Sequence, residues 1–316
     1  MIEIGSDCNQ HCTFCCQADQ RGLPDKGTEQ IKREIDRAAA DGVNNLSIQG
    51  GEFTIRPDCI ELVEFAFQKN CFKNIHVTTN GLVFAYKAFS QRIAQAGLSA
   101  ANFSIHSPRA KVHDALTRRS GSFELSINGI RNLSQCYNPT SQGRVNICSS
   151  ITVVKHNFHD LIKLIDLLAD LGIHDFHLNY AIPTGNALKN FDSVVPRFSE
   201  ISGFVHKAIS HCVEKEYKIF VTGIPLCFMT GFEVYLDEAH KSEFTMVPFH
   251  HPGKDIITNY KAEVRMSMKV KHDKCKNCGY DRICEGVFKN YVDVHGFEEM
   301  NPSKRKFESL FDWHIG

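Results

Sequence analysis

The sequence has one tryptophan, no long hydrophobic run and no excess of charge of either sign. Its 36 lysines and arginines balance 36 aspartates and glutamates, so the chain has no net field that would attract nucleic acid or an anionic membrane. No stretch approaches the roughly 18 consecutive apolar residues that a membrane-spanning helix needs. Met1 is followed by Ile-Glu-Ile rather than by a signal peptide. We therefore expect a cytoplasmic protein with neither membrane nor nucleic-acid partners.

Cysteine, in contrast, is abundant: the 316 residues include 13. Disulfides are rare in a reducing compartment, and clustered cysteines there more often bind metal or take part in chemistry. Residues 8–16 contain four of them and residues 275–284 contain three, so both ends of the chain are candidate sites. The scattered cysteines are expected to be small buried apolar residues; they are Cys59, Cys71, Cys136 and Cys212.

Short β-like segments alternate with helical segments over the first 222 residues. The predicted strands are 2–4, 45–49, 74–79, 101–106, 144–154 and 174–180, each followed by a helix, such as 28–40 and 57–69. Strands that alternate with helices of this length form βαβ units and a parallel sheet. Six such units are too few for a closed eight-stranded barrel.

The predicted strands alternate apolar and polar residues. Phe103 and Ile105 oppose Asn102 and Ser104, and the other strands share this period of two. A doubly wound sheet is covered on both faces and has continuous apolar strands, whereas a curved sheet around a cavity needs one polar face. We predict an α/β fold, a partial (β/α)6 TIM-like barrel.

Chemistry in parallel α/β barrels is located at the carboxyl ends of the strands. The most unusual segments of the sequence lie there: 8–16, 50–52, 79–81 and 183–185. After residue 222 the alternation stops, and the remainder includes the run His250-His251-Pro252-Gly253. We expect a barrel domain at 1–222 and a smaller appended domain at 223–316.

The first cysteine cluster places three thiols on a polar loop after the first predicted strand. Cys8, Cys12 and Cys15 are separated by three and two residues. A four-iron cluster normally has four thiolate ligands, so three would leave one iron open to another ligand. A zinc site or unrelated thiols are the alternatives.

The Cys-x3-Cys-x2-Cys spacing, with Phe14 before the third cysteine, resembles the defining motif of the radical S-adenosylmethionine (radical SAM) superfamily. In that family the amino and carboxylate groups of SAM chelate the open iron of a 4Fe–4S cluster. The resemblance implies that Cys8, Cys12 and Cys15 hold the cluster and that Cys16 is a packing or neighbouring residue. It covers about residues 1–222.

The same resemblance implies further residues that contact SAM. They are Gly50, Gly51 and Glu52 at the methionine amino group, Thr79 and Asn80 in the turn after the third strand, Ser104 near the ribose, and Arg118 or Arg119 at the carboxylate. His76, His106 and His177 are also polar residues on predicted strands. We expect them to be hydrogen-bonded core histidines.

The second cluster has the spacing Cys275-x2-Cys278-x5-Cys284, which resembles the auxiliary iron–sulfur extension of SPASM/twitch radical SAM enzymes. The fuller SPASM pattern has another cysteine where this chain has Phe288, so two complete auxiliary clusters are not expected. Cys227 is the remaining cysteine after residue 222 and completes a set of four. We expect one auxiliary 4Fe–4S cluster, with structural zinc on the same four residues as the alternative.

The resemblance implies reductive cleavage of SAM by a one-electron donor of the flavodoxin or ferredoxin type. The resulting 5′-deoxyadenosyl radical would abstract a hydrogen atom from a substrate in the polar lumen. Peptide modification is the commonest theme of the branch; dehydrogenation or epimerisation of a small molecule, sugar or nucleoside is the alternative. Against a peptide substrate, the first strand begins at residue 2, and we expect no peptide-recognition domain before it.

Two further hypotheses concern a rival class of protein and the role of Cys148. A non-catalytic iron–sulfur electron carrier or redox sensor is the rival class, although a carrier needs neither the Gly-Gly-Glu segment nor a polar lumen. Cys148 lies on the polar face of the fifth predicted strand. It is a candidate hydrogen-atom donor to a substrate radical, with simple packing as the alternative.

Overall fold

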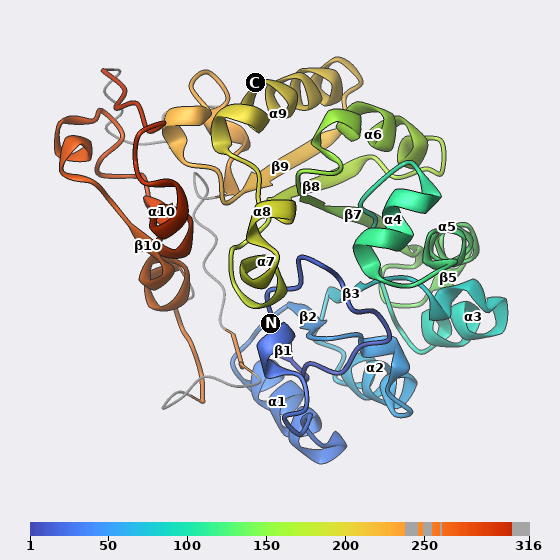
Figure 1. Cartoon of the computed structure of the whole chain (residues 1–316). Helices are drawn as coiled ribbons and strands as arrows, with labels where there is room; N and C mark the ends of the chain where they lie inside the picture. The colour runs from blue at the N-terminus through green and yellow to red at the C-terminus, as the bar shows by residue number, and fades with distance from the viewer. Residues whose placement is uncertain (238–245, 249–254, 260, 305–316) are drawn as a thin grey trace.

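The centre of the molecule is a sheet of seven parallel strands in the order β1-β2-β3-β4-β7-β8-β9. This computed structural model describes residues 1–237, 246–248, 255–259 and 261–304 (Figure 1). The strands of the sheet are β1 (Ile2–Glu3), β2 (Asn45–Gln49), β3 (Asn74–Thr79), β4 (Ala100–Ser104), β7 (Asn146–Val153), β8 (Asp175–Tyr180) and β9 (Lys218–Thr222). Two small antiparallel pairs complete the strands: β5 (Tyr137–Asn138) with β6 (Gly143–Arg144), and β10 (Lys269–Val270) with β11 (Val287–Phe288).

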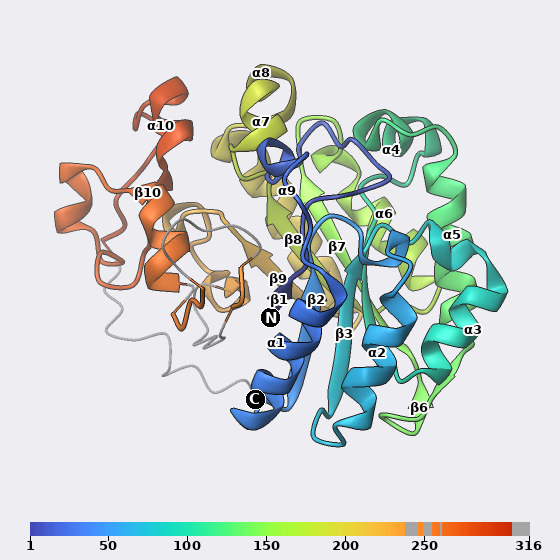
Figure 2. The ribbon, with the colours of Figure 1, turned by 90° about the horizontal axis from the view of Figure 1, so that it is seen from below.

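Helices cover the outer face of the curved sheet. They are α1 (Thr28–Ala40), α2 (Cys59–Gln68), α3 (Lys87–Gln95), α4 (Ala110–Thr117), α5 (Ser122–Leu133), α6 (Leu161–Ala169) and α9 (Phe198–Glu214). Figures 1 and 2 show this outer layer around the strands. The short helices α7 (Gly185–Lys189) and α8 (Phe191–Val194) follow β8, and α10 (Lys289–His295) lies in the C-terminal part. None of the helices described is both long and apolar enough to cross a bilayer.

The two faces of the sheet differ as the sequence predicted. In β3, Ile75 and Val77 are fully buried against the helices, whereas His76 and Thr78 on the other face are only partly buried. β8 has the same alternation. The fold is therefore the predicted partial TIM-like barrel with a polar inner face. The expected count of six strands is wrong by one, because β9 follows α9 after three residues and is absent from the prediction.

The C-terminal part covers both edges of the open sheet. Val247 bridges β1: the backbone N–H of Glu3 donates to its carbonyl at 2.9 Å, and its own N–H donates to the Met1 carbonyl at 2.8 Å. At the other edge, Leu236 forms a bridge with Val221 of β9. Exposed edge strands invite pairing with other chains, so these contacts protect an incompletely closed barrel.

The C-terminal part also shares its hydrophobic core with the barrel. The ring of Phe198 on α9 lies 4.6 Å from that of Tyr180 and 4.5 Å from that of Tyr291 on α10. Figure 1 shows the orange and red segments packed beside α7 and α8. The expected boundary at residue 222 coincides with the end of β9. A separate domain at 223–316 stays a prediction, and residues 250–253 lie outside the described residues.

Three charged side chains are buried together in the C-terminal part. The Glu285 carboxylate accepts hydrogen bonds from Arg265 Nε and Nη2 at 3.0 and 2.6 Å and from Lys269 Nζ at 2.9 Å. These side chains are at most 8 % exposed. Asp237 pairs with the other Arg265 nitrogen at 3.0 Å. Removing one member of such a cluster leaves buried charge uncompensated.

Glu285→Ala should therefore destabilise the protein by about 3 to 5 kcal/mol. Chemical denaturation of matched preparations measures this loss. Asp273→Ala is the control, because Asp273 pairs with Lys276 at the surface with 87 % of its side chain exposed, and exposed pairs contribute about 1 kcal/mol or less. Equal, small effects of both substitutions would show that Glu285 does not hold this region together.

Candidate functional site

A cavity of about 260 Å³ opens at the carboxyl ends of the parallel strands. Its walls come from the loop after β1, the turns after β2 and β3, and the ends of β4, β7 and β8. The lining residues include Cys8, Cys12, Cys15 and Cys16, Gly50 and Gly51, Thr79 and Asn80, Ser104, His106, Thr152 and Asn179. The structure therefore brings most of the expected SAM-contacting residues to one place.

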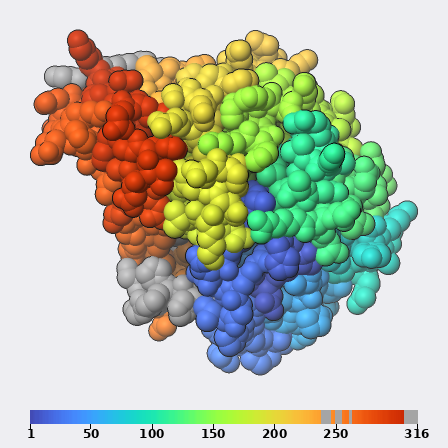
Figure 3. Space-filling view, in the orientation of Figure 1, coloured from blue at the N-terminus to red at the C-terminus, as the bar shows by residue number. Residues whose placement is uncertain are grey.

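The cysteine loop, residues 8–16, is held in place on one side by contacts with α7. The Asn186 amide side chain donates to the Cys12 carbonyl at 2.9 Å, and its backbone N–H donates to the Cys15 carbonyl at 2.9 Å. Gly185 (φ +54°) has no room for a side chain, because a Cβ there would lie 2.5 Å from the Cys15 carbonyl oxygen. In Figure 3, dark blue N-terminal atoms are visible between the yellow atoms of α7 and α8 and the blue-green atoms of α4.

The end of α4 holds the other side of the cysteine loop. The backbone N–H of Thr13 donates to the Leu116 carbonyl at 2.8 Å, and that of His11 donates to the Thr117 carbonyl at 3.0 Å. Such main-chain contacts fix the path of the loop whatever its side chains bind. Gly185 belongs to the segment 183–185 that the sequence had indicated. Asn186 and the end of α4 carry no sequence motif, so sequence reasoning missed them.

The thiols of the cysteine loop are crowded and partly withdrawn from water. Burial raises the pKa of Cys8 to about 11, and burial together with the neighbouring Cys8 and Cys15 raises the pKa of Cys12 still further. The backbone N–H of Gln10 points at the Cys8 sulfur, at 3.4 Å. Thiolates are the metal-binding form, and a bound metal supplies the charge that such a site lacks. These residues therefore fit an iron–sulfur cluster.

Gly50 and Gly51 lie directly against the chain that leads into the cysteine loop. The Gly51 N–H donates to the Gly5 carbonyl at 2.8 Å. A Cβ on Gly51 would lie 2.0 Å from the Asp7 carbonyl oxygen. Only glycine permits this approach, which explains the Gly-Gly pair physically.

Glu52 differs from its two glycine neighbours. It is 1 % exposed and does not line the cavity. Its carboxylate accepts hydrogen bonds from Thr54 N–H and Oγ1 at 3.0 and 2.6 Å, from Thr79 Oγ1 at 2.8 Å and from Asn80 N–H at 2.6 Å. Burial raises the pKa of Glu52, and these donors oppose the rise. The carboxylate thus ties the end of β2 to the turn after β3.

The turn after β3 reaches the cysteine loop through Asn80. The Asn80 side-chain nitrogen donates to Asn9 Oδ1 at 2.6 Å and lies 3.8 Å from the Cys8 sulfur. Glu52 therefore positions two residues of the cavity wall, Thr79 and Asn80, without lining the cavity itself.

Neither of the expected basic residues lines the cavity. Arg118 ends α4 in the left-handed conformation (φ +53°) and is exposed, and Arg119 donates to the Asn9 carbonyl at 2.8 Å. The basic residue on the cavity wall is Arg21, which sequence reasoning missed. Its Nη2 donates to the Gln10 carbonyl at 2.6 Å, and its buried Nε has no partner among the described residues.

Cys148 and two of the three histidines do not line the cavity. Cys148 is 9 % exposed, its thiol donates to the Ala101 carbonyl at 3.8 Å, and burial raises its pKa to about 12. This position fits the packing alternative. His76 Nδ1 lies 3.3 Å from Ser47 Oγ, and His177 stacks on Phe220. His106 is the exception and lies on the wall.

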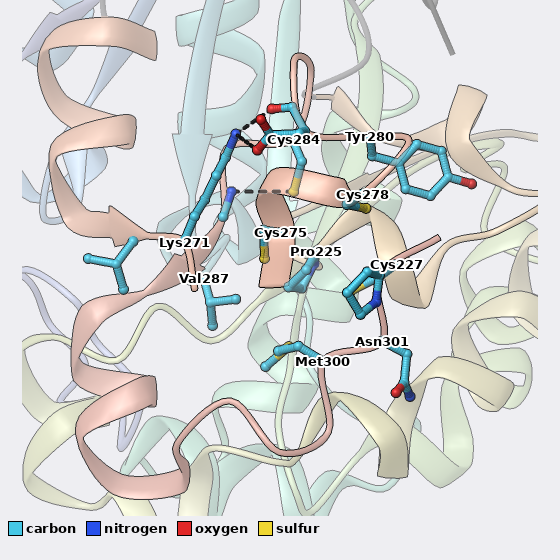
Figure 4. A pocket seen from close by; sticks show the side chains of 14 residues that line it. Pro225, Cys227, Lys271, Cys275, Cys278, Tyr280, Cys284, Val287, Met300 and Asn301 are labelled. Carbon is cyan, nitrogen blue, oxygen red and sulfur yellow. Dashed lines mark hydrogen bonds and ion pairs between the residues drawn. The ribbon is translucent and has the colours of Figure 1, made fainter. Parts of the chain in front are cut away.

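The second cysteine cluster forms a pocket of its own. Cys227, Cys275, Cys278 and Cys284 all line it, with Pro225 and Met300 (Figure 4). Burial, and then the three other cysteines, raises the pKa of Cys227 to about 12.

Two backbone N–H groups donate to sulfur atoms of this pocket. Gly286 N–H donates to Cys284 Sγ at 3.4 Å, and Ser303 N–H donates to Cys278 Sγ at 3.3 Å. Within the described residues, no three Cys, His, Asp or Glu side chains converge as ligands of a single metal ion. The thiolates of a four-iron cluster each bind a different iron, so they need not converge on one point.

Comparisons with known proteins define the class. The sequence model of the radical SAM superfamily matches residues 2–168, which is more than half of the chain. The protein therefore belongs to the radical SAM superfamily, whose members are enzymes that use a 4Fe–4S cluster and SAM.

Particular relatives have different activities. The chain is 28 % identical over 196 residues to the AdoMet-dependent heme synthase of Methanosarcina barkeri, an alignment that covers 61 % of this chain and 53 % of that protein. It thus spans about half the length of that relative. It is 27 % identical over 317 residues to the GTP 3′,8-cyclase of Limosilactobacillus fermentum, covering 96 % of this chain and 81 % of that enzyme.

Solved structures confirm the fold. Streptococcus suis SuiB bound to S-adenosylmethionine superposes with a TM-score of 0.65 at 16 % identity, covering 99 % of this chain and 76 % of SuiB. SuiB is also known bound to its precursor peptide SuiA, with a TM-score of 0.64. At this identity the likeness concerns the fold alone.

The buried bonds of Glu52 generate a prediction about its role. Glu52→Gln places an amide NH2 against backbone and hydroxyl donors, and an unsatisfied buried group costs about 1 to 3 kcal/mol. The substitution should lower the stability of the SAM-free protein by this amount, measured by chemical denaturation. An unchanged stability combined with a tenfold loss of SAM affinity would instead support the direct contact with the methionine amino group expected from the sequence.

Proposed function

We propose that this protein cleaves SAM reductively and abstracts a hydrogen atom from a substrate held in the polar cavity. The observation that carries the proposal is the convergence of Cys8, Cys12 and Cys15 with the Gly50–Gly51 backbone around one cavity at the carboxyl edge of the sheet. Neither an electron carrier nor a redox sensor needs a substrate-sized cavity beside its thiols. This convergence therefore favours an enzyme over that rival class.

The proposed cluster ligands are Cys8, Cys12 and Cys15, with the fourth iron left for SAM. Bound there, the cluster and SAM supply the 5′-deoxyadenosyl radical. The protein holds the thiolates through the backbone of the cysteine loop and donates Gln10 N–H to one sulfur. The Gly50–Gly51 backbone and Ser104 are the proposed contacts for the methionine and ribose parts of SAM. Arg21 replaces Arg118 and Arg119 as the proposed partner of the carboxylate, because it alone of the three lines the cavity.

The walls of the cavity also restrict what the radical can attack. Phe14, Tyr180 and Ile182 provide apolar surface beside the polar residues, and such surface limits the water around a reactive group. The cofactor supplies the difficult chemistry, while the protein supplies orientation and shielding.

The charge of the cavity favours a substrate without phosphates, and we propose a peptide. Arg21 is the one lysine or arginine among the described lining residues. A nucleoside triphosphate carries several negative charges and is normally held by several cations, whereas peptide amides need only neutral donors and acceptors. A complex of SuiB, which shares this fold, with its precursor peptide SuiA supports the proposal. The second candidate is nucleotide tailoring, which the long alignment with a GTP 3′,8-cyclase favours.

An auxiliary 4Fe–4S cluster is proposed for the second pocket, with Cys227, Cys275, Cys278 and Cys284 as ligands. The fit rests on four thiols around one pocket and on the N–H···S hydrogen bonds to Cys278 and Cys284. Hydrogen bonds to sulfur tune the potential of such clusters. The cluster would take an electron from the substrate or anchor it. A flavodoxin- or ferredoxin-type protein is the proposed reductant of the first cluster.

SAM cleavage tests the proposed function and the ligand assignment together. The reduced, iron-reconstituted protein should form 5′-deoxyadenosine from SAM, measured by chromatography. Cys15→Ala should abolish product formation, because one cluster ligand is lost, whereas Cys16→Ala should retain most of it. Absence of 5′-deoxyadenosine from the wild-type protein with a full complement of iron would refute the proposed SAM cleavage. Activity that depends on Cys16 and not on Cys15 would refute the assignment.

Adding a substrate candidate separates the two substrate classes. A deuterium-labelled short peptide should increase 5′-deoxyadenosine formation and transfer deuterium to it, whereas GTP should not increase 5′-deoxyadenosine formation. Stimulation by GTP would favour the nucleotide candidate instead.

Iron analysis tests the auxiliary cluster. Two intact 4Fe–4S clusters give about eight irons per chain, and replacing Cys8, Cys12 and Cys15 together by alanine should leave about four. Cys71→Ala is the control and should retain about eight, because Cys71 is exposed, contrary to the burial expected from the sequence, and belongs to neither cluster of cysteines. A triple variant that contains zinc and no iron would show that the second site is structural.

A further inference from the structure

Gln10 is one of the three residues between Cys8 and Cys12, positions that the cysteine motif leaves unspecified. It lines the cavity and is 3 % exposed. Its backbone N–H donates to the Cys8 sulfur at 3.4 Å. Its side-chain oxygen Oε1 accepts a hydrogen bond from the Cys12 thiol at 3.6 Å. Gln10 thus contacts two of the three proposed cluster ligands, one through its main chain and one through its side chain.

The side-chain nitrogen of Gln10 is not satisfied by these contacts. Nε2 is buried and has no hydrogen-bond partner among the described residues. An amide N–H that is left unpaired in a protein interior is costly, and buried polar groups are as a rule paired. The unpaired donor therefore indicates that an acceptor belongs in the cavity beside it.

The main chain of Gln10 is held on both sides. Arg21 Nη2 donates to the Gln10 carbonyl at 2.6 Å, and the backbone N–H of His11, the next residue, donates to the Thr117 carbonyl at 3.0 Å. The last torsion of a glutamine side chain is broad and roughly two-fold. Turning about this torsion alone therefore exchanges the amide atom that faces the Cys12 sulfur, without moving the loop.

Binding of a cluster would reverse the role of the Cys12 sulfur. A thiol can donate its proton to Oε1, but a cysteine that binds metal is a thiolate and has no proton to donate. The oxygen of Gln10 would then face a negatively charged sulfur, whereas its nitrogen carries two N–H donors. Half a turn of the amide brings Nε2 near the position of Oε1, where the unpaired donor meets the thiolate.

We propose that Gln10 is a positioning residue of the first cluster, whose side-chain N–H donates a hydrogen bond to the Cys12 thiolate and raises the reduction potential of the cluster. Reduction adds negative charge to the cluster, and a hydrogen bond to a charged acceptor is stronger than one to a neutral acceptor. The donor therefore stabilises the reduced form more than the oxidised form. This inference rests on the proposed function, because it takes Cys8, Cys12 and Cys15 to be ligands of one cluster.

The midpoint potential of the first cluster, measured by a redox titration followed by electron paramagnetic resonance, tests the proposal. The signal of this cluster is identified as the one that changes when SAM is added. Gln10→Met keeps an unbranched side chain and removes the donor. It should favour the oxidised cluster about tenfold, which is a shift of about 59 mV to a more negative potential for one electron. Gln10→Leu should shift the potential in the same direction.

The matched control is Gln20→Met, the same substitution at a glutamine shortly after the cysteine loop. Gln20 does not line the cavity, and its unpartnered buried atom among the described residues is the acceptor Oε1, which cannot donate to sulfur. The potential of this variant should equal that of wild type.

Several outcomes would overturn the proposal. They are an unchanged or raised potential in Gln10→Met and Gln10→Leu, an equal shift in Gln20→Met, or loss of the cluster from both Gln10 variants while their circular dichroism remains that of wild type. A wild-type protein that forms no cluster at the first cysteines would refute the proposed function instead. If neither Gln10 variant folds, electron–nuclear double resonance of wild type with nitrogen-15 in its glutamine side chains decides. The reduced first cluster should show a coupled nitrogen-15, and its absence would refute the hydrogen bond.

Discussion

The backbone of the cysteine loop is held in place by four other segments of the chain, and the candidate site depends on this constraint. Three thiols that repel one another when ionised cannot determine their own spacing, so the spacing has to come from the main chain. Hydrogen bonds from α7 and α4 fix the carbonyl and amide groups on either side of Cys12. The Gly-Gly turn after β2 and Asn80 in the turn after β3 hold the start of the loop.

These segments can meet because the sheet is parallel and curved. All seven strands end at the same edge, so residues as far apart in the sequence as Thr13 and Asn190, 177 positions, become neighbours there. The incomplete closure leaves the polar inner face open at this edge. The barrel leaves β1 and β9 as edge strands, and Val247 and Leu236 of the C-terminal part form bridges with them. That part thus stabilises the barrel, in addition to carrying a cysteine pocket of its own.

Hydrogen bonds within the protein already fix the positions of the polar groups on the cavity wall in the absence of a ligand. Glu52 accepts four hydrogen bonds, of which two fix Thr79 and Asn80, and Asn157 fixes His106 and Thr152. Both networks are buried, where a satisfied hydrogen bond is stronger and an unmade one more costly than in water. Such positioning costs no reorganisation when a ligand binds.

The amino-acid sequence alone was enough to predict the parallel α/β class, the boundaries of β2 and β3, the polar inner face, and the superfamily. Those features are local: a period of two, a cysteine spacing and a Gly-Gly pair can be read within a few residues. The folded chain was needed to show that Arg21, and not Arg118 or Arg119, lies on the cavity wall. It was also needed to show that Glu52 is turned into a buried hydrogen-bond network, whereas His106 lies beside the cavity. It also showed β9 and the pairing of Val247 with β1. These outcomes depend on which residues far apart in the chain occupy the space around each side chain. Hydrophobic period and motif spacing carry no information about that, because they describe one segment at a time.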